Sequence, residues 1–183
     1  MAAQAMAAQE LDVPLVAPPA EADPIRLRLL QGLSSRTLSR LLALETEAFP
    51  ECERLGNFGM QEHAMQRTAG LLVAEPDGPP PPPEPDPMGF LIYTRTGDAG
   101  IIMKLAVGAA FRGRGVGRAL LRFGISELRR PTRRAPPSTI MLHVDPSRTA
   151  ARGLYESMGF VQEQHLTRYY ADGRDALLMK LRS

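Results

Sequence analysis

A run rich in glycine and arginine, AAFRGRGVGRALL at residues 109–121, restricts the possible folds of this chain more than any other segment. Three glycines and three arginines fall between Arg112 and Arg118. Glycine costs backbone entropy, so such a cluster needs a structural reason. The run leads directly into a periodic apolar stretch, from about Val116 to Arg130, that predicts a helix. Because the amides of a glycine-rich turn at a helix N-terminus bind anions, the segment predicts a strand–turn–helix unit with an anion site.

The composition indicates one globular domain and excludes several classes of protein. The 183 residues are 44% hydrophobic and 23% charged, and the formal net charge of +2 is no argument for a direct nucleic-acid role. No apolar run approaches the ~20 residues of a membrane span, so we expect no membrane role. The single cysteine, Cys52, favours a reducing compartment. We therefore expect a cytoplasmic protein, with an organellar location left open.

Two segments stand apart from the rest of the predicted domain at residues 25–183. Residues 1–24 are rich in Ala and Pro and lack the basic and apolar regions of a secretory signal, which predicts a disordered tail. Residues 76–88 contain eight prolines. They predict a lengthened, exposed loop inserted between two strands, because proline cannot donate to a ladder. A proline-recognition module is a candidate partner for residues 76–87.

Apolar periodicities along the chain predict the order β-α-α-β-β-β-α-β-α-β-β. Ser34 or Ser35 can cap the first helix, and a later helix is expected to begin at Ser147 and to end before Gly159. The last two strands are expected to run from FVQEQHLTRYY, at residues 160–170, through a turn into DALLMKLR. This order predicts an α/β fold with a mixed sheet and helices on both faces.

The pattern Arg112-x-x-Gly115-x-Gly117, followed by LYESMGF at 154–160, resembles the GNAT acetyltransferase superfamily over residues 25–183. Two other phosphate loops are excluded, because the Gly-Lys-Ser/Thr ending of a P-loop is absent and Arg118 replaces the third glycine of a dinucleotide site. The resemblance implies a mostly antiparallel sheet of about seven strands with a splayed central pair and about four helices on both faces. It also implies acetyl-CoA as co-substrate and no metal. The cofactor-binding residues that it implies are Leu105, Ala106, Val107, Arg112, Gly113, Arg114, Gly115, Val116, Gly117 and Arg118.

The stretches LHV, LYESMGF and RYYADGRDALLMKL together resemble the protein N-terminal acetyltransferases, which include the ribosomal-protein alanine acetyltransferase. The resemblance implies transfer to the α-amine of protein or peptide N-termini by direct attack in a ternary complex. The ribosome or an auxiliary subunit would be a further partner. Tyr169 and Tyr170 would hold the first residues of the substrate. Phe49, Pro50 and Glu51 would form the opposite wall of the peptide site.

Three residues are candidates for proton transfer. His143 is the first choice for the base, because histidine titrates in the right range and the related enzymes carry histidine or glutamate at this place. Tyr155 would protonate the departing thiolate, as the tyrosine of this motif does in many relatives. Glu51 could order a water or pair with the substrate ammonium. Each of the three could instead be a purely structural residue. His143 would then be a hydrogen-bonded histidine on a strand, Tyr155 an aromatic residue of the core, and Glu51 a solvated glutamate in a loop.

Three positions depart from the pattern of the relatives. Ile101 replaces a tyrosine at the start of the splayed strand, Arg148 replaces an asparagine near the last helix, and Glu53 lies near the place of a wall tyrosine. The cofactor contact at Arg148 and the peptide specificity therefore stay open. Two alternative functions also remain: a lysine or polyamine acetyltransferase of the same fold, and an inactive acyl-CoA-binding module.

Overall fold

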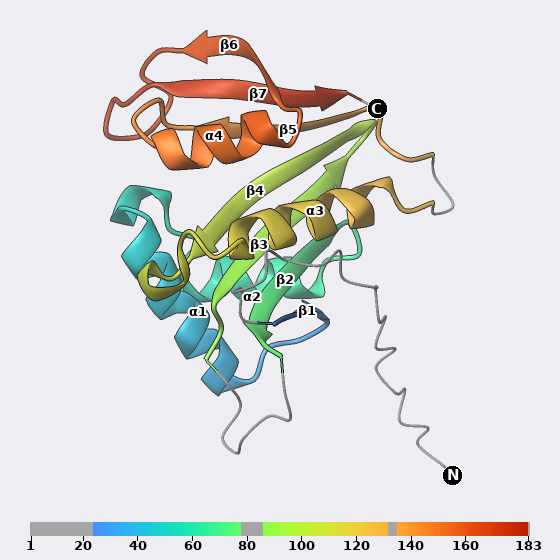
Figure 1. The fold of residues 1–183 in the computed structure, drawn as a ribbon, viewed down its shortest axis with the longest axis vertical. Helices are drawn as coiled ribbons and strands as arrows, with labels where there is room; N and C mark the ends of the chain where they lie inside the picture. Colours follow the sequence, from blue (N-terminus) through green and yellow to red (C-terminus); the bar gives the residue numbers. More distant parts are fainter. Residues whose placement is uncertain (1–23, 78–85, 132–134, 183) are drawn as a thin grey trace.

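The computed structural model describes residues 24–77, 86–131 and 135–182. Within these ranges the chain forms one seven-stranded sheet with helices on both faces (Figure 1). The predicted tail, apart from Pro24, and most of the proline-rich loop lie outside the described residues. The elements follow the predicted order: β1 Ile25–Leu30, α1 Ser35–Ala48, the 3-10 turn η1 Glu51–Glu53, α2 Gly56–Met65, β2 Ala69–Pro76, β3 Gly89–Thr96, β4 Ala99–Val107, the 3-10 turn η2 Ala109–Phe111, α3 Val116–Arg129, β5 Thr139–Val144, α4 Thr149–Ser157, β6 Val161–Leu166 and β7 Ala176–Arg182.

The strands lie in the order β1-β2-β3-β4-β5-β7-β6. All neighbours are antiparallel except β4 and β5, which are parallel. The pairing of β4 with β5 stops at Ile102 opposite Leu142, although β4 continues to Val107 and β5 to Val144. The two central strands therefore separate at this end, which confirms the expected fold.

Two hydrophobic cores hold the helices against the two faces of the sheet. The α1–α2 core includes Leu71 and Val73 of β2, and the α3–α4 core includes Leu72 and Ala74 of the same strand. Successive residues of a strand point to opposite faces, so a strand buried on both sides is continuously apolar. This explains why β2 and β3 lack the alternating pattern of a half-exposed strand.

Serine side chains near two helix starts have different roles. The Ser34 hydroxyl accepts a hydrogen bond from the N–H of Thr37 at 3.1 Å and caps α1, as predicted. The last helix begins at Thr149 rather than at the expected Ser147. The N–H and hydroxyl of Ser147 both donate to Asp145, at 2.8 and 2.7 Å, so this residue belongs to the turn before the helix.

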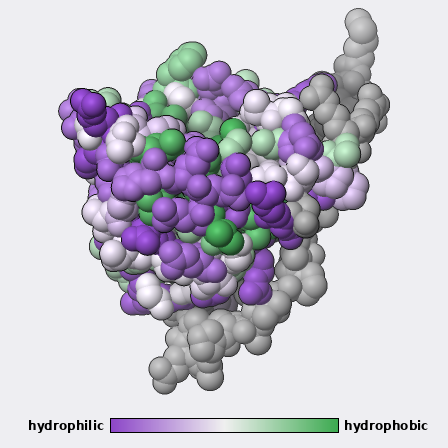
Figure 2. All heavy atoms as spheres, turned by 90° about the horizontal axis from the view of Figure 1, so that it is seen from above, coloured by the Kyte–Doolittle hydropathy of each residue, from purple (hydrophilic) through white to green (hydrophobic). Residues whose placement is uncertain are grey.

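The strand predicted over 160–170 is wrong at its end, because β6 ends at Leu166. Arg168 has a φ of 50°, and its N–H donates to Asp175 Oδ1 at 2.9 Å. These features turn the chain out of the ladder, so the tyrosines at 169–170 lie in a loop. Figure 2 looks down on the end of the molecule that carries β6 and shows a mainly hydrophilic surface with small, separate hydrophobic patches.

Candidate active site

A β-bulge at Met103 decides which way the end of β4 faces. Tyr93 pairs with Ile102 and Ile92 pairs with Lys104, so Met103 is an extra residue between them. A bulge of this kind reverses the alternation of side chains along the strand. Beyond it, Lys104 and Ala106 face α1, whereas Leu105 and Val107 face the α3–α4 core.

Lys104 is a buried lysine that fastens the splayed strand to the segment after α1. Its Nζ lies 3.6 Å from Glu45 Oε1, donates to the main-chain carbonyl of Glu53, and lies 4.2 Å from the centre of the Phe49 ring. Burial lowers the pKa of Lys104, although Glu45 and Glu53 act in the opposite direction. The sequence interpretation assigned no role to this side chain. A single charge in an otherwise apolar strand was the available signal.

The glycine-rich turn between β4 and α3 has the predicted form. Gly113 and Gly115 have φ values of 75° and 84°, and neither has an atom within 4 Å of where a Cβ would lie. Glycine is required there by the left-handed backbone rather than by crowding. Arg114 lies over the ring of Phe111 at 5.9 Å. Because no side chain in the described part of the chain caps α3 before Val116, its first amides are available to an anion.

Gly117 has a different role from the other two glycines. A Cβ there would lie 3.3 Å from Leu154 Cδ2 and 3.5 Å from Val107 Cγ2. The absent side chain therefore allows α3 to approach α4 and the end of β4 closely. The sequence did not distinguish this packing role from an approach to phosphate.

Two arginines of the turn are held against the protein. Arg112 Nε donates to the carbonyl of Val107 at 3.1 Å, and its Nη2 lies 3.3 Å from Glu47 Oε1. Arg118 Nη2 donates to Ser157 Oγ at 3.0 Å and joins α3 to α4. These side chains order the turn, so its main-chain amides are the groups best placed to bind an anion.

His143 lies near the end of β5, beside the separation from β4. Its neighbours Leu142 and Val144 pack in the α3–α4 core, so the imidazole faces the opposite side of the sheet. The half-buried ring stacks on Tyr169, with centroids 4.6 Å apart and planes at 15°. Burial lowers the pKa of His143 below its ordinary value. Neither ring nitrogen has a hydrogen-bond partner in the described part of the chain, so a neutral imidazole is available there.

Tyr155 lies on the other side of the sheet from His143. Its ring is buried in the α3–α4 core, 5.9 Å from the ring of Phe160. Burial raises the pKa of Tyr155 to about 12, so the hydroxyl keeps its proton at neutral pH. Across residues 24–77, 86–131 and 135–182, no group hydrogen-bonds to this hydroxyl. A proton acceptor and a proton donor thus flank the splayed strands from opposite faces.

Of the predicted wall residues, Phe49 and Pro50 lie between α1 and η1, and Glu51 begins η1. The Phe49 ring is buried, with Lys104 Nζ 4.2 Å and the Arg148 guanidinium 5.1 Å from its centre. Pro50 and Glu51 are exposed. The Glu51 carboxylate has no ion pair with any described residue, and the structure brings it to neither His143 nor Tyr155.

The buried carboxylate of this wall belongs instead to Glu53. Its Oε1 accepts from Arg148 Nη2 at 2.9 Å and from Arg174 Nη2 at 2.6 Å. Arg174 also forms an ion pair with Asp145. Glu53, Asp145, Arg148 and Arg174 are called the ionic clamp below. Two of the positions that depart from the pattern of the relatives, 53 and 148, are therefore paired with each other, which no local sequence signal indicated.

Tyr169 and Tyr170 lie in the loop 167–175 between β6 and β7. Their rings meet edge to face, with centroids 5.2 Å apart and planes at 89°. Tyr169 is 47% exposed, whereas burial raises the pKa of Tyr170 to about 12. The structure therefore brings Tyr169 to His143 and Tyr170 to the ionic clamp, where the Arg174 guanidinium lies 5.0 Å from its ring.

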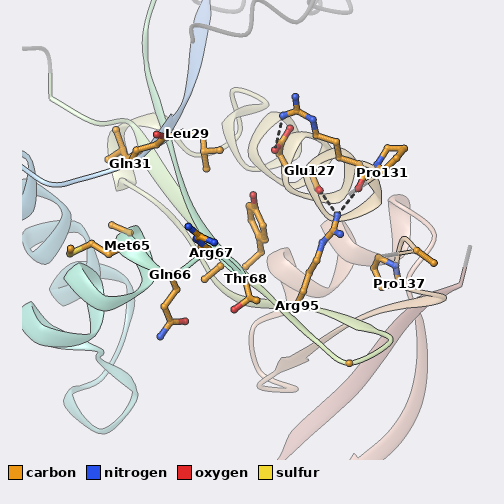
Figure 3. Close-up of a pocket in the computed structure, with 17 residues that line it drawn as sticks. Leu29, Gln31, Met65, Gln66, Arg67, Thr68, Arg95, Glu127, Pro131 and Pro137 are labelled. Atoms are coloured by element: carbon orange, nitrogen blue, oxygen red, sulfur yellow. Dashed lines mark hydrogen bonds and ion pairs between the residues drawn. The ribbon is translucent and has the colours of Figure 1, made fainter. Parts of the chain in front are cut away.

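A separate cavity of about 740 Å³ lies at the far end of the sheet, where β3 and α3 end (Figure 3). Arg95 closes the C-terminus of α3 there, donating to the carbonyls of Glu127 and Arg130 at 2.9 Å each. None of the predicted site residues lines this cavity. The predicted proton-transfer residues His143 and Tyr155 lie instead beside the splayed strands β4 and β5.

The described residues contain no group of three or more His, Cys, Asp or Glu side chains arranged to hold a metal. None of their helices is both long and apolar enough to cross a membrane.

Comparisons with known proteins agree with the geometry. The model of the acetyltransferase (GNAT) family matches residues 38–160. An uncharacterised N-acetyltransferase of Methanocaldococcus jannaschii, MJ1530, is 30% identical over 161 residues, which covers 82% of this chain and 89% of the relative. The ribosomal-protein bS18-alanine N-acetyltransferase of Escherichia coli is 38% identical over 87 residues, or 46% of this chain and 56% of that enzyme.

Solved structures show the same fold. The E. coli ribosomal-protein-S18-alanine N-acetyltransferase superposes with a TM-score of 0.67 at 26% identity, covering 87% of this chain and 94% of that chain. Arabidopsis thaliana NAA60 in complex with acetyl-CoA superposes with a TM-score of 0.71 at 19% identity, covering 87% and 98%. The family match and the archaeal relative each extend over more than half of the sequence. The chain therefore belongs to the GNAT family of acetyltransferases.

Proposed function

We propose that this protein transfers an acetyl group from acetyl-CoA to the N-terminal α-amine of protein or peptide chains. The observation that carries the proposal is the placement of His143 and Tyr155 on opposite faces of the sheet, beside the separated ends of β4 and β5. An amine that arrives on the His143 side meets a neutral imidazole. A thiolate that leaves on the Tyr155 side meets a protonated phenol.

The residues around the turn fit acetyl-CoA. The uncapped amides of α3 and the open space beside Gly113 and Gly115 suit a pyrophosphate. On the side toward β5, no described strand pairs with the segment 103–107 of β4, so its main chain can pair with an extended ligand arm. When bound, acetyl-CoA supplies the acetyl group as an activated thioester. The chain itself must orient the amine, exclude water and move two protons.

The energetics of the acceptor favour an α-amine. Only a neutral amine attacks, and a chain-terminal amine with a pKa near ~7.8 costs about 1 kcal/mol to neutralise at pH 7. A lysine side chain with a pKa near ~10.4 costs roughly 4.6 kcal/mol. A single half-buried imidazole such as His143 suits the easier task. The E. coli relative named above is a ribosomal-protein-S18-alanine N-acetyltransferase, which supports a protein as acceptor.

Acetyl transfer forms a bond from the amine nitrogen to the carbonyl carbon and breaks the carbon–sulfur bond, so one proton must leave the amine and one must reach the thiolate. His143 accepts the proton of the attacking amine, and its lowered pKa keeps it in the basic form at neutral pH. Tyr155 donates its proton to the departing sulfur, and its burial keeps that proton in place until then. Glu51, exposed on the rim, is proposed to attract the substrate ammonium before this transfer.

A matched peptide panel tests the proposal. Each short peptide is prepared with a free N-terminus, with a blocked N-terminus, and with or without an internal lysine. Thiol release from acetyl-CoA is followed, and mass spectrometry locates the acetyl group. We expect turnover only with free N-termini. Acetylation of blocked peptides at lysine indicates a side-chain acetyltransferase, and acetyl-CoA binding without thiol release indicates an inactive module.

A further inference from the structure

We propose that Arg174 is a positioning residue of the acceptor site, which acts through the ionic clamp to keep the 167–175 loop, and with it Tyr169, closed over His143. The effect of Arg174 on catalysis rests on the proposed function. Its control of the loop does not depend on the substrate.

Arg174 joins three separate segments of the chain. Its guanidinium contacts Glu53 in η1 at 2.6 Å, Asp145 at the end of β5, and Asp172 in its own loop at 2.5 Å. The side chains of Glu53 and Asp145 are only 9% and 6% exposed. Hydrogen bonds between charged groups are among the stronger ones, and more so where water is partly excluded. One side chain therefore ties the loop to both walls of the acceptor site.

Contacts within the loop connect Arg174 to Tyr169. Tyr170 donates its N–H to the carbonyl of Arg174 at 3.0 Å, and Gly173 donates to the carbonyl of Tyr170 at 2.9 Å. The Tyr170 ring also packs under the Arg174 guanidinium and against the edge of Tyr169. Tyr169 in turn covers one face of His143. A release of Arg174 should therefore free the aromatic cover of the base.

The remaining members of the clamp keep their own partners when Arg174 is lost. Glu53 retains Arg148 at 2.9 Å, and Asp145 retains the N–H and hydroxyl of Ser147. We therefore expect Arg174→Gln to fold while the loop opens. The double variant Glu53→Gln/Arg174→Gln breaks the same bridge but removes one charge of each sign. An effect that both variants share is due to loop opening, whereas an effect of Arg174→Gln alone is due to the changed charge near His143.

A matched control exists on the same hairpin. Arg182 Nη2 pairs with Glu163 Oε1 at 2.9 Å, in an exposed position on the β6–β7 pair. The Arg182→Gln variant removes an arginine of the hairpin without touching the acceptor site. The three variants are first compared by circular dichroism to establish that each is folded.

The first experiment needs no substrate. Hydrogen exchange at the Gly173 and Arg168 amides is expected to accelerate roughly tenfold or more in both clamp variants and to stay unchanged in Arg182→Gln. The chain has three histidines, so the imidazole of His143 can be followed by NMR. Its pKa is expected to rise toward the ordinary value in the charge-matched double variant. Unchanged exchange and an unchanged His143 pKa in that variant would overturn the proposal.

The second experiment measures the reaction. Both clamp variants are expected to raise the peptide KM roughly tenfold with the acetyl-CoA KM unchanged, and Arg174→Lys should restore part of the loss. An equal rise in both KM values would contradict a positioning role. If no peptide is acetylated by the unaltered protein, the proposed function fails, and the exchange and NMR measurements still decide whether the clamp controls the loop.

Discussion

Replacement of His143 by alanine gives the sharpest test of the proton path. An imidazole at its ordinary pKa of 6.5 would be about three-quarters neutral at pH 7. Because burial lowers that pKa, the neutral fraction in the folded protein is higher still, so the imidazole is in the form that the proposed base requires. Removing a positioned base costs ~10²- to 10⁴-fold in rate, so kcat should fall by that factor while acetyl-CoA affinity is kept.

The pH profile of kcat/KM shows which group was lost. In the unaltered enzyme two groups must lose protons, the peptide amine near ~7.8 and His143 below 6.5. The acidic limb should therefore steepen from a slope of one to a slope of two as the pH falls through the pKa of His143. In His143→Ala the slope should stay at one throughout, measured with the same peptide.

The Tyr155→Phe variant is the matched comparison. It keeps the ring packed against Phe160 and removes only the hydroxyl. Because the pKa of Tyr155 is about 12, its loss should lower kcat without moving either limb between pH 6 and 10. A His143→Ala enzyme with unaltered kcat and a persisting slope of two would refute the assignment of the base, and Glu51 would then be tested next.

Three further predictions concern the cofactor turn, the buried lysine and the tail. Gly117→Glu should abolish acetyl-CoA binding in calorimetry, because the new Cβ would lie 3.3 Å from Leu154 and the new carboxylate would repel the pyrophosphate. The control is Gly153→Glu, which should leave that affinity unchanged because no described atom lies within 4 Å of the new Cβ. Lys104→Met should lower the free energy of unfolding by about 3 kcal/mol in denaturant titrations, since Glu45 loses its buried cation, and an unaltered midpoint would contradict this. Deletion of residues 1–22 should leave peptide turnover nearly unchanged, and a large rise in KM would show instead that the tail contributes to the site.

The sequence predicted the parts of the fold that depend on local chemistry. The Ser34 cap and the start of α3 at Val116 follow from neighbouring residues. The separation of β4 and β5 came from the family resemblance rather than from periodicity. The sequence interpretation failed at the end of β6, because Asp175 withdraws Arg168 from the ladder through a side-chain contact that no pattern of hydrophobicity encodes.

The site was predicted less completely, because its charged groups meet across long stretches of chain. Glu53 and Arg174 are separated by 121 positions, and their contact exists only once the sheet has formed. The sequence interpretation therefore chose the nearby Glu51 as the acid of the wall. The burial of Lys104 was not predicted either, because the face of the sheet on which Lys104 lies depends on a bulge that the sequence did not reveal.

That bulge makes the length of β4 as important as its composition. If Met103 were placed in regular alternation instead of in the bulge, the Lys104 ammonium would lie among the apolar side chains under α3, and Leu105 and Val107 would turn toward α1. A surface loop absorbs an added or deleted residue at little cost, whereas a residue added to this ladder, or deleted from it at a position other than the bulge, would exchange the two faces of the strand beyond the change. Substitutions can tune this strand, but most insertions and deletions would turn its side chains to the wrong face, so the spacing from the Gly97 turn to Gly113 should be kept in any engineered or recombined form of the protein.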